Sequence, residues 1–159
     1  MKILTIILVL LSPLAAHSQM PSMSTLQDLP SVAVSVRAVT PDGKSFGVKA
    51  EELTRVVTET LNSAGVKVAP ADSVTSVADM PTVEITAIVN RLSGSGHIYS
   101  LRIALREIVE LKRETKNLVE LGAITWEKET QGYTSSPDRI VASATTLAER
   151  FATEWRAAN

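Results

Sequence analysis

The residues with the most chemical potential stand at positions 38–45, in the sequence Ala-Val-Thr-Pro-Asp-Gly-Lys-Ser. This segment has the spacing of a phosphate-binding loop if Ala38 replaces the first glycine, and it lies between a predicted strand and a predicted helix. Such a loop wraps successive backbone N–H groups around phosphate, and Pro41 removes one of them. We therefore interpret residues 40–43 as a plain Pro-Asp-Gly turn. The Gly-Ser-Gly run at 94–96 joins two predicted strands, so no helix amino terminus follows it to receive a phosphate.

His97 is the next candidate catalytic residue. It could serve a catalytic triad only beside a serine and an acid. It adjoins the flexible Gly-Ser-Gly tip and lacks the rigid support that catalysis demands, so we expect a solvated loop histidine. The acidic residues never reach the dense spacing of a calcium loop. We therefore expect no enzyme activity, no cofactor and no metal site. The acidic residues in question are Asp72, Asp79, Glu107, Glu110 and Glu114.

Two arginines, Arg102 and Arg106, are predicted to share one strand face and could meet an anionic partner. Nucleic acid is excluded as that partner, because the formal net charge is -1 and only 4% of the residues are aromatic. Large aromatic side chains dominate burial in a chain with so few of them. Trp126 and Trp155 are therefore interpreted as packing residues rather than as a ligand cradle.

The amino terminus has the organisation of a cleavable signal peptide. Lys2 precedes an unbroken apolar run at 3–11, and Ala16 and Ser18 then give the small-x-small pattern that signal peptidase accepts. Cleavage is predicted between Ser18 and Gln19, which would place the protein in the periplasm or outside the cell. The apolar run is about half the roughly 20 residues of a bilayer span, and no later stretch is long and uncharged enough to span.

The chain has no cysteine. This excludes a disulfide scaffold, a zinc finger and thiol catalysis. It also excludes the cysteine-linked lipid anchor of bacterial lipoproteins, so we expect a protein without lipid attachment.

Hydrophobic periodicity predicts alternating strands and helices after a flexible leader at 19–29. Apolar residues recur at every second position in the predicted strands and at spacings of three and four in the predicted helices. The predicted order is a strand from 32, a helix over 49–64, a short strand at 66–68, a loop at 70–81, strands from 82, over 99–111 and over 118–128, and a helix from Pro137. Polar tips at 93–96 and 114–117 separate the last three strands, and Glu107 predicts a bulge or an exposed strand end.

This order predicts one α+β domain over residues 30–159, with a mostly antiparallel sheet of about four to five strands. The element order is β-α-β-β-β-β-α, and both helices carry a single apolar stripe that packs on one face of the sheet. The other face must then be exposed to water, covered by a partner or covered by a second copy.

The layout resembles small envelope modules of Gram-negative bacteria. The residues that carry the resemblance are LNSAGVKV at 61–68, Ala78-Asp79, and Ala-Ile-Thr-Trp at 123–126. The chain is similar over about 30–157 to the TolB amino-terminal domain, to the lipopolysaccharide-assembly lipoprotein LptE and to CsgG-like secretion lipoproteins. The resemblance implies a non-catalytic role in envelope assembly or transport, although the chain lacks the anchoring cysteine of the lipoprotein members.

Two functional hypotheses follow. The first is a periplasmic interaction module that binds an envelope protein or a second copy through its open sheet face or an edge strand. The candidate contact residues are Arg102, Ala104, Arg106, Ile108 and Ile124. The alternative is a small-ligand carrier or hydrolase-like protein, whose polar pocket would lie between the helices and the meander and include His97.

Overall fold

The computed structural model describes residues 26–70, 80–94, 96–109 and 122–159. These ranges contain four strands and three helices, and the predicted α+β class is confirmed. The elements are β1 (Ala33–Val39), α1 (Pro41–Phe46), α2 (Ala50–Ser63), β2 (Thr82–Arg91), β3 (His97–Glu107), β4 (Ala123–Thr134) and α3 (Asp138–Ala158).

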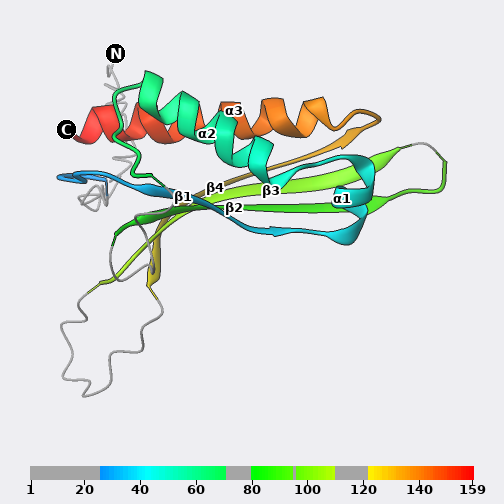
Figure 1. Ribbon diagram of the computed structural model, residues 1–159, viewed down its shortest axis with the longest axis horizontal. Coiled ribbons are helices and arrows are strands. Elements are labelled where there is room, and N and C mark those ends of the chain that lie inside the picture. Colours follow the sequence, from blue (N-terminus) through cyan, green and yellow to red (C-terminus); the bar gives the residue numbers. More distant parts are fainter. Residues whose placement is uncertain (1–25, 71–79, 95, 110–121) are drawn as a thin grey trace, which may run out of the picture.

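The four strands form one mixed sheet in the order β1-β2-β3-β4. Strand β1 pairs with β2 in parallel, which requires a crossover connection, and the chain between them contains α1 and α2; the other two pairs are antiparallel. Helices α2 and α3 lie side by side on the same face of the sheet, and no helix of the described ranges covers the opposite face (Figure 1). We call that opposite side the open face.

The core lies between the sheet and the two long helices. Strands β2 and β3 supply alternate side chains to it, because successive residues of a strand point to opposite faces. The helices supply residues spaced by three and four, as their apolar stripes predict. The fully buried members include Val83, Ile85, Ala87 and Val89 of β2, Leu101, Ile103 and Leu105 of β3, Leu53, Val57 and Leu61 of α2, and Ile140, Leu147 and Phe151 of α3.

The predicted turn at residues 40–43 is wrong, because Pro41 begins the short helix α1. Proline suits the first helical position, where its missing N–H leaves no hydrogen bond unmade. The helix ends at Gly47, whose φ of 102° lies in the left-handed region that favours glycine. Gly43 is buried, and a Cβ there would lie 3.0 Å from Val39 and 3.1 Å from Val89. This close approach of α1 to the sheet stabilises a helix where the local sequence favours a turn.

Three predicted boundaries also change. The short strand at 66–68 is reduced to a single bridge between Val32 and Val68. Strand β3 occupies 97–107 instead of 99–111, and strand β4 occupies 123–134 instead of 118–128. The bulge or strand end expected at Glu107 is confirmed, because β3 ends at Glu107 and its register with β4 shifts between Leu105 and Arg106. The signal peptide, most of the loop at 70–81 and the tip at 114–117 lie outside the described residues.

Candidate functional site

The open face carries the side chains of β2, β3 and β4 that alternate with the core residues. The register aligns them in rows across the three strands, so that Ile88 lies beside Ser100 and Ser100 beside Gln131. Large hydrophobic side chains that remain exposed in the described ranges all belong to these strands or to the residues that directly follow them. They are Ile88, Leu92, Ile98, Ile108, Ile124 and Tyr133.

Three of these residues form an apolar cluster at the hairpin end of the open face. Ile98 pairs with Tyr133 across β3 and β4, and Ile88 lies diagonally from Ile98 on β2. Their exposed fractions are 45% for Ile88, 44% for Ile98 and 60% for Tyr133. A cavity of about 350 Å³ is lined by Ile88 and Ile98 together with Asn90, Ser100 and Gln131. We call Ile88, Ile98 and Tyr133 the apolar cluster.

The middle of the open face is held by ion pairs. The carboxylate of Glu84 accepts hydrogen bonds from Arg106 Nε at 3.1 Å and from Arg37 Nη1 at 3.4 Å. Arg106 also donates to the carbonyl of Gly122 at 3.0 Å. Arg102 lies 3.6 Å from Glu127. These arginines are therefore already neutralised by neighbours on their own sheet.

The next carboxylate on this face is Glu129. Gln131 and Ser100 donate hydrogen bonds to it at 2.9 Å and 2.6 Å, and Arg102 is nearby. These hydrogen bonds, Gln131 first, hold the pKa of Glu129 below its ordinary value. The carboxylate therefore remains ionised at neutral pH, because its hydrogen-bond donors stabilise the charged form.

The predicted contact residues have different surroundings. Arg106 and Ile124 are register partners, and Ile124 is 41% exposed. Ile108 follows the end of β3 and is 49% exposed, whereas Ala104 is only 2% exposed and offers almost no surface. The sequence prediction missed the apolar cluster, because it assigned the core face of β3 without following the alternate residues to Ile98.

His97 opens strand β3 and stacks on Phe46 with ring centroids 3.8 Å apart, so the predicted solvated loop histidine is wrong. The two rings line a cavity of about 430 Å³ together with Asp42, Ser45 and Arg91. The segments that resemble phosphate loops thus meet at one end of the sheet. Within the described ranges no hydrogen bond joins His97 to Ser45 or Asp42, and Asp42 instead accepts the backbone N–H of Arg91 at 3.1 Å. No triad is assembled there.

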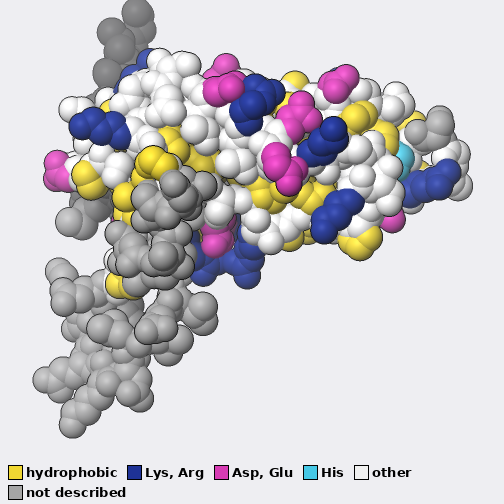
Figure 2. All heavy atoms as spheres, viewed as in Figure 1, with side chains coloured by type: hydrophobic (Ala, Val, Ile, Leu, Met, Phe, Trp, Pro, Cys, Tyr) yellow, Lys and Arg dark blue, Asp and Glu magenta, His cyan; other side chains and the backbone are white. Residues whose placement is uncertain are grey.

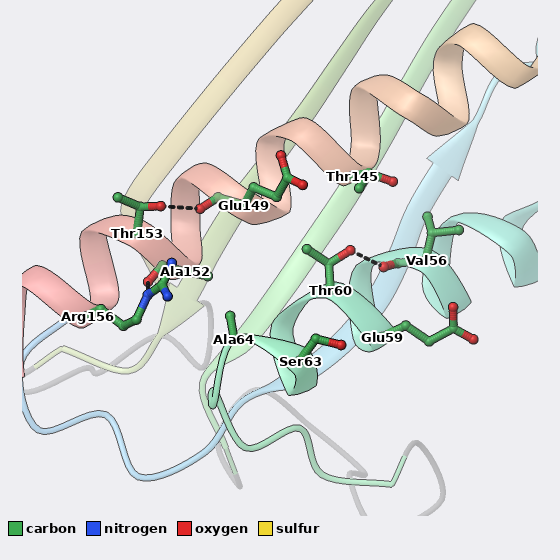
Figure 3. Close-up of a pocket in the computed structure, with 10 residues that line it drawn as sticks. All are labelled: Val56, Glu59, Thr60, Ser63, Ala64, Thr145, Glu149, Ala152, Thr153 and Arg156. Carbon is green, nitrogen blue, oxygen red and sulfur yellow. Dashed lines mark hydrogen bonds between the residues drawn. The ribbon is translucent and has the colours of Figure 1, made fainter.

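The groove between α2 and α3 has a volume of about 720 Å³ and is lined by threonine, small and charged residues (Figure 3). Its threonine hydroxyls point back to their own helices, since Thr60 donates to the carbonyl of Val56 at 2.7 Å and Thr153 to that of Glu149 at 2.8 Å. Their donors are thus used. Positive and negative side chains are interspersed over the helical surface (Figure 2).

A further cavity of about 350 Å³ lies between α3 and β4, where the alternative hypothesis placed a polar pocket. Its lining includes Tyr99, Arg139 and Arg150, but not His97.

Trp126 is a packing residue, as predicted. It is 8% exposed, meets Phe151 edge-on with ring centroids 4.9 Å apart, and donates from Nε1 to Glu154 at 2.7 Å. Trp155 is half-buried against the core.

Histidine and carboxylate side chains of the described ranges do not gather in groups of three that could hold a metal ion. None of the helices in these ranges has both the length and the apolar character of a membrane span.

Comparison with known proteins finds no protein-family model and no curated protein that matches the chain. Among solved structures, the chain aligns with the 2.35 Å crystal structure of a minor lipoprotein from Acinetobacter baumannii. The two are 11% identical, the alignment covers 80% of this chain and 88% of that chain, and the TM-score is 0.34. The resemblance to the TolB, LptE and CsgG-like modules remains a prediction.

Proposed function

We propose that the protein is an exported, non-catalytic binding module of the bacterial cell envelope, and that it engages a protein partner through the open face of its sheet. One observation carries the proposal. The large hydrophobic side chains that stay exposed in the described ranges lie on β2, β3, β4 and the adjoining residues, and not on the helices. Apolar side chains gathered on one exposed face are typical of a surface that becomes buried in a complex.

The charges of the open face fit an uncharged partner surface. Three arginines and three glutamates of the described ranges lie among its strands, and the ion pairs join most of them. They are Arg37, Arg102, Arg106, Glu84, Glu127 and Glu129. Because their charges cancel, the face exerts little long-range attraction on either sign. Specificity then rests on the shape of the apolar cluster and on Ile124 at the opposite end.

The face is large enough for a specific interface. Three strands of ten to twelve residues span roughly 35 Å by 14 Å, or about 500 Å² in projection. Side-chain relief adds to this area, which approaches the roughly 600 Å² per partner at the lower end of specific protein interfaces.

Export is the second part of the proposal and rests on the sequence pattern of residues 1–18, which lie outside the described residues. Expression in a Gram-negative host, followed by mass spectrometry of the periplasmic fraction, tests it. The expected product begins at Gln19. A chain that retains Lys2 in the membrane fraction would contradict cleavage.

Photo-crosslinking from the apolar cluster tests the partner surface. A benzoylphenylalanine residue at Tyr133 should give a discrete adduct in cells of the natural host, and Ile88→Ser with Ile98→Ser should abolish that adduct. Both isoleucines are about half exposed, so the serine variants should unfold at nearly the temperature of the parent protein.

The same photoreactive residue at Arg55 on α2 is the control, because this side chain is exposed on the helical side of the molecule. Equal adducts from both positions would reject a specific open-face interface. Loss of cellular function in His97→Ala with an intact adduct would favour the alternative small-ligand role.

A further inference from the structure

We propose that the groove between the edge strand β4 and helix α3 is a second binding surface, which takes up an extended acidic segment of a partner protein as an additional strand. This surface adjoins the open face at Gln131 and Gly132, which line a cavity on each side of the sheet, but its other wall is α3 and its two arginines belong to that helix. The proposal therefore does not depend on what the open face binds. Three features support it: an unpaired strand edge, a cavity beside that edge and two arginines without ion pairs.

The first feature is the edge of β4. This strand is the last of the sheet and pairs only with β3 among the described strands. Alternate backbone groups of an antiparallel strand point away from its neighbour, so half of the N–H and C=O groups of β4 face outward. Charged side chains, which discourage strand addition, occur at Glu127, Lys128 and Glu129. Residues 130–134, Thr-Gln-Gly-Tyr-Thr, carry no charge. This uncharged half is the part of the edge open to a new strand.

The second feature is the cavity of about 350 Å³ beside that uncharged half. Its inner part is bridged by a hydrogen bond of 2.9 Å between Tyr99 Oη and Ser143 Oγ, which joins β3 to α3. Tyr99 is the register partner of Gly132, and farther along the strand Trp126 and Lys128 contact Glu154 of α3. Helix α3 therefore runs back along β4 and forms a wall parallel to its edge. Side chains of an added strand that point toward α3 would enter this cavity.

The third feature is the charge of the wall. Arg139 and Arg150 line the cavity, and both are exposed. Neither forms an ion pair in the described part of the chain, whereas Arg37, Arg102 and Arg106 of the open face do. Arg150 acts only at longer range on Glu154, on its own helix. Two such guanidinium groups beside an open strand edge favour carboxylates on the incoming segment.

The spacing of the arginines matches an extended segment. Eleven residues separate Arg139 from Arg150, which is about 16 Å along a helix. An extended strand covers a comparable distance, about 13 to 20 Å, in four to six residues, and a step of four or six keeps both side chains on one face. Because its side chains alternate, acidic residues at every second position would all point toward α3, and two of them would reach the two arginines. The ligand is therefore a strand with alternating acidic residues, in the manner of other peptides that add to sheet edges beside a helix.

Fluorescence anisotropy with defined peptides tests this assignment. The probe is a labelled ten-residue peptide of alternating Thr and Glu, titrated with the purified exported protein. We expect saturable binding that weakens with salt, and at least about tenfold weaker binding of the corresponding Thr-Lys peptide. Arg139→Ala with Arg150→Ala should lower the affinity at least about fivefold. The matched control, Lys44→Ala with Arg55→Ala, removes the same charge from exposed positions elsewhere and should change the affinity less than about twofold.

A second peptide separates strand addition from simple charge attraction. Methylation of alternate backbone nitrogens of the Thr-Glu peptide removes the donors that pair with a strand edge but keeps every carboxylate. We expect this peptide to lose binding. Retained affinity, equal binding of the lysine peptide or an unchanged arginine variant would each overturn the proposal. The Ile88→Ser, Ile98→Ser variant should bind the Thr-Glu peptide normally, so failure at the groove is distinguishable from failure at the open face.

Discussion

Arg102 and Arg106 have the same side chain, the same strand and the same face, yet they differ in what surrounds them. The Arg106 side chain is 14% exposed and satisfies Glu84, itself 15% exposed, and the Gly122 carbonyl. Arg102 is 34% exposed, and its partner Glu127 is 55% exposed. Arg106 therefore forms a largely buried ion pair that contributes to the stability of the fold. The ion pair of Arg102 is more exposed and is screened by solvent.

Arg106→Ala should therefore destabilise the protein by about 2 kcal/mol, because it leaves a largely buried carboxylate without its best donor. Arg102→Ala should cost less than about 1 kcal/mol, as is usual for exposed pairs. Chemical unfolding in urea measures both values. Equal losses would show that the burial of the Glu84 pair has no energetic consequence.

Two tyrosine–glycine contacts between β3 and β4 give a second prediction at this scale. The ring of Tyr99 occupies the place of a Gly132 side chain, since a Cβ there would lie 2.9 Å from Tyr99 Cε1, and the ring of Tyr133 does the same at Gly96. Tyr99 is 6% exposed and tied to Ser143, whereas Tyr133 is 60% exposed and can turn away.

Gly132→Ala should therefore destabilise the protein by about 1–3 kcal/mol through overpacking, and Gly96→Ala should cost clearly less. Thermal unfolding of the two variants measures the difference. Because both substitutions introduce alanine in place of a glycine that a tyrosine ring contacts, each is the other's control, with Gly132 inside β4 and Gly96 directly before β3. The reverse order of stabilities would contradict the assignment of Tyr99 as the immobile ring.

At the scale of elements, α3 is joined to β4 through Glu154. Its carboxylate accepts the indole N–H of Trp126 at 2.7 Å and lies 3.2 Å from the ammonium of Lys128. The Trp126 hydrogen bond is the largest influence on the pKa of Glu154 and, together with Lys128, holds this pKa below its ordinary value, although partial burial opposes the shift. Because the folded-state pKa is the lower one, the contact stabilises the protein above about pH 4.5, and this contribution is lost as the pH falls through the folded pKa.

Trp126→Phe should therefore raise the pKa of Glu154, since phenylalanine has no N–H to donate. Carboxyl-detected NMR titration measures the shift directly. The stability of Glu154→Gln should in addition fall less steeply below pH 4.5 than that of the parent protein. An unchanged pKa in Trp126→Phe would show that this hydrogen bond does not form in solution.

The elements that the sequence predicts correctly are those specified by local periodicity. Alternation at Val83, Ile85 and Ala87 and helical spacing at Leu53 and Val57 each describe one buried face, so the core and the long helices follow from them. Helix α1 does not follow, because contact with the sheet stabilises it.

The apolar cluster also could not be predicted from one segment. Ile98 and Tyr133 become neighbours only through the register of β3 and β4, which depends on residues far apart in the sequence. Ala104 illustrates the opposite error, since its position on the face was predicted, but its exposed fraction of only 2% was not.

At the scale of the whole molecule, the first and last described residues are tied together. Asn159 donates from Nδ2 to the carbonyl of Leu26 at 2.9 Å, and its Oδ1 accepts the backbone N–H of Asp28 at 2.9 Å. Leu26 is 2% exposed and belongs to the core. The packed part of the chain thus includes residues that the sequence assigns to a leader ending at 29.

Shortening the chain should therefore have a sharp threshold. A chain that begins at Leu26 keeps the buried leucine and both hydrogen bonds to Asn159, whereas a chain that begins at Ser31 loses all three contacts. Burial of one leucine contributes about 2–4 kcal/mol, so the shorter chain should unfold at markedly lower urea concentration. In the longer chain, Leu26→Ala should reproduce most of that loss, and Asn159→Ala only about 1 kcal/mol of it. Equal stability of the two chains would mean that the domain begins after residue 30 and that the contact of Asn159 with Leu26 and Asp28 contributes nothing to its folding.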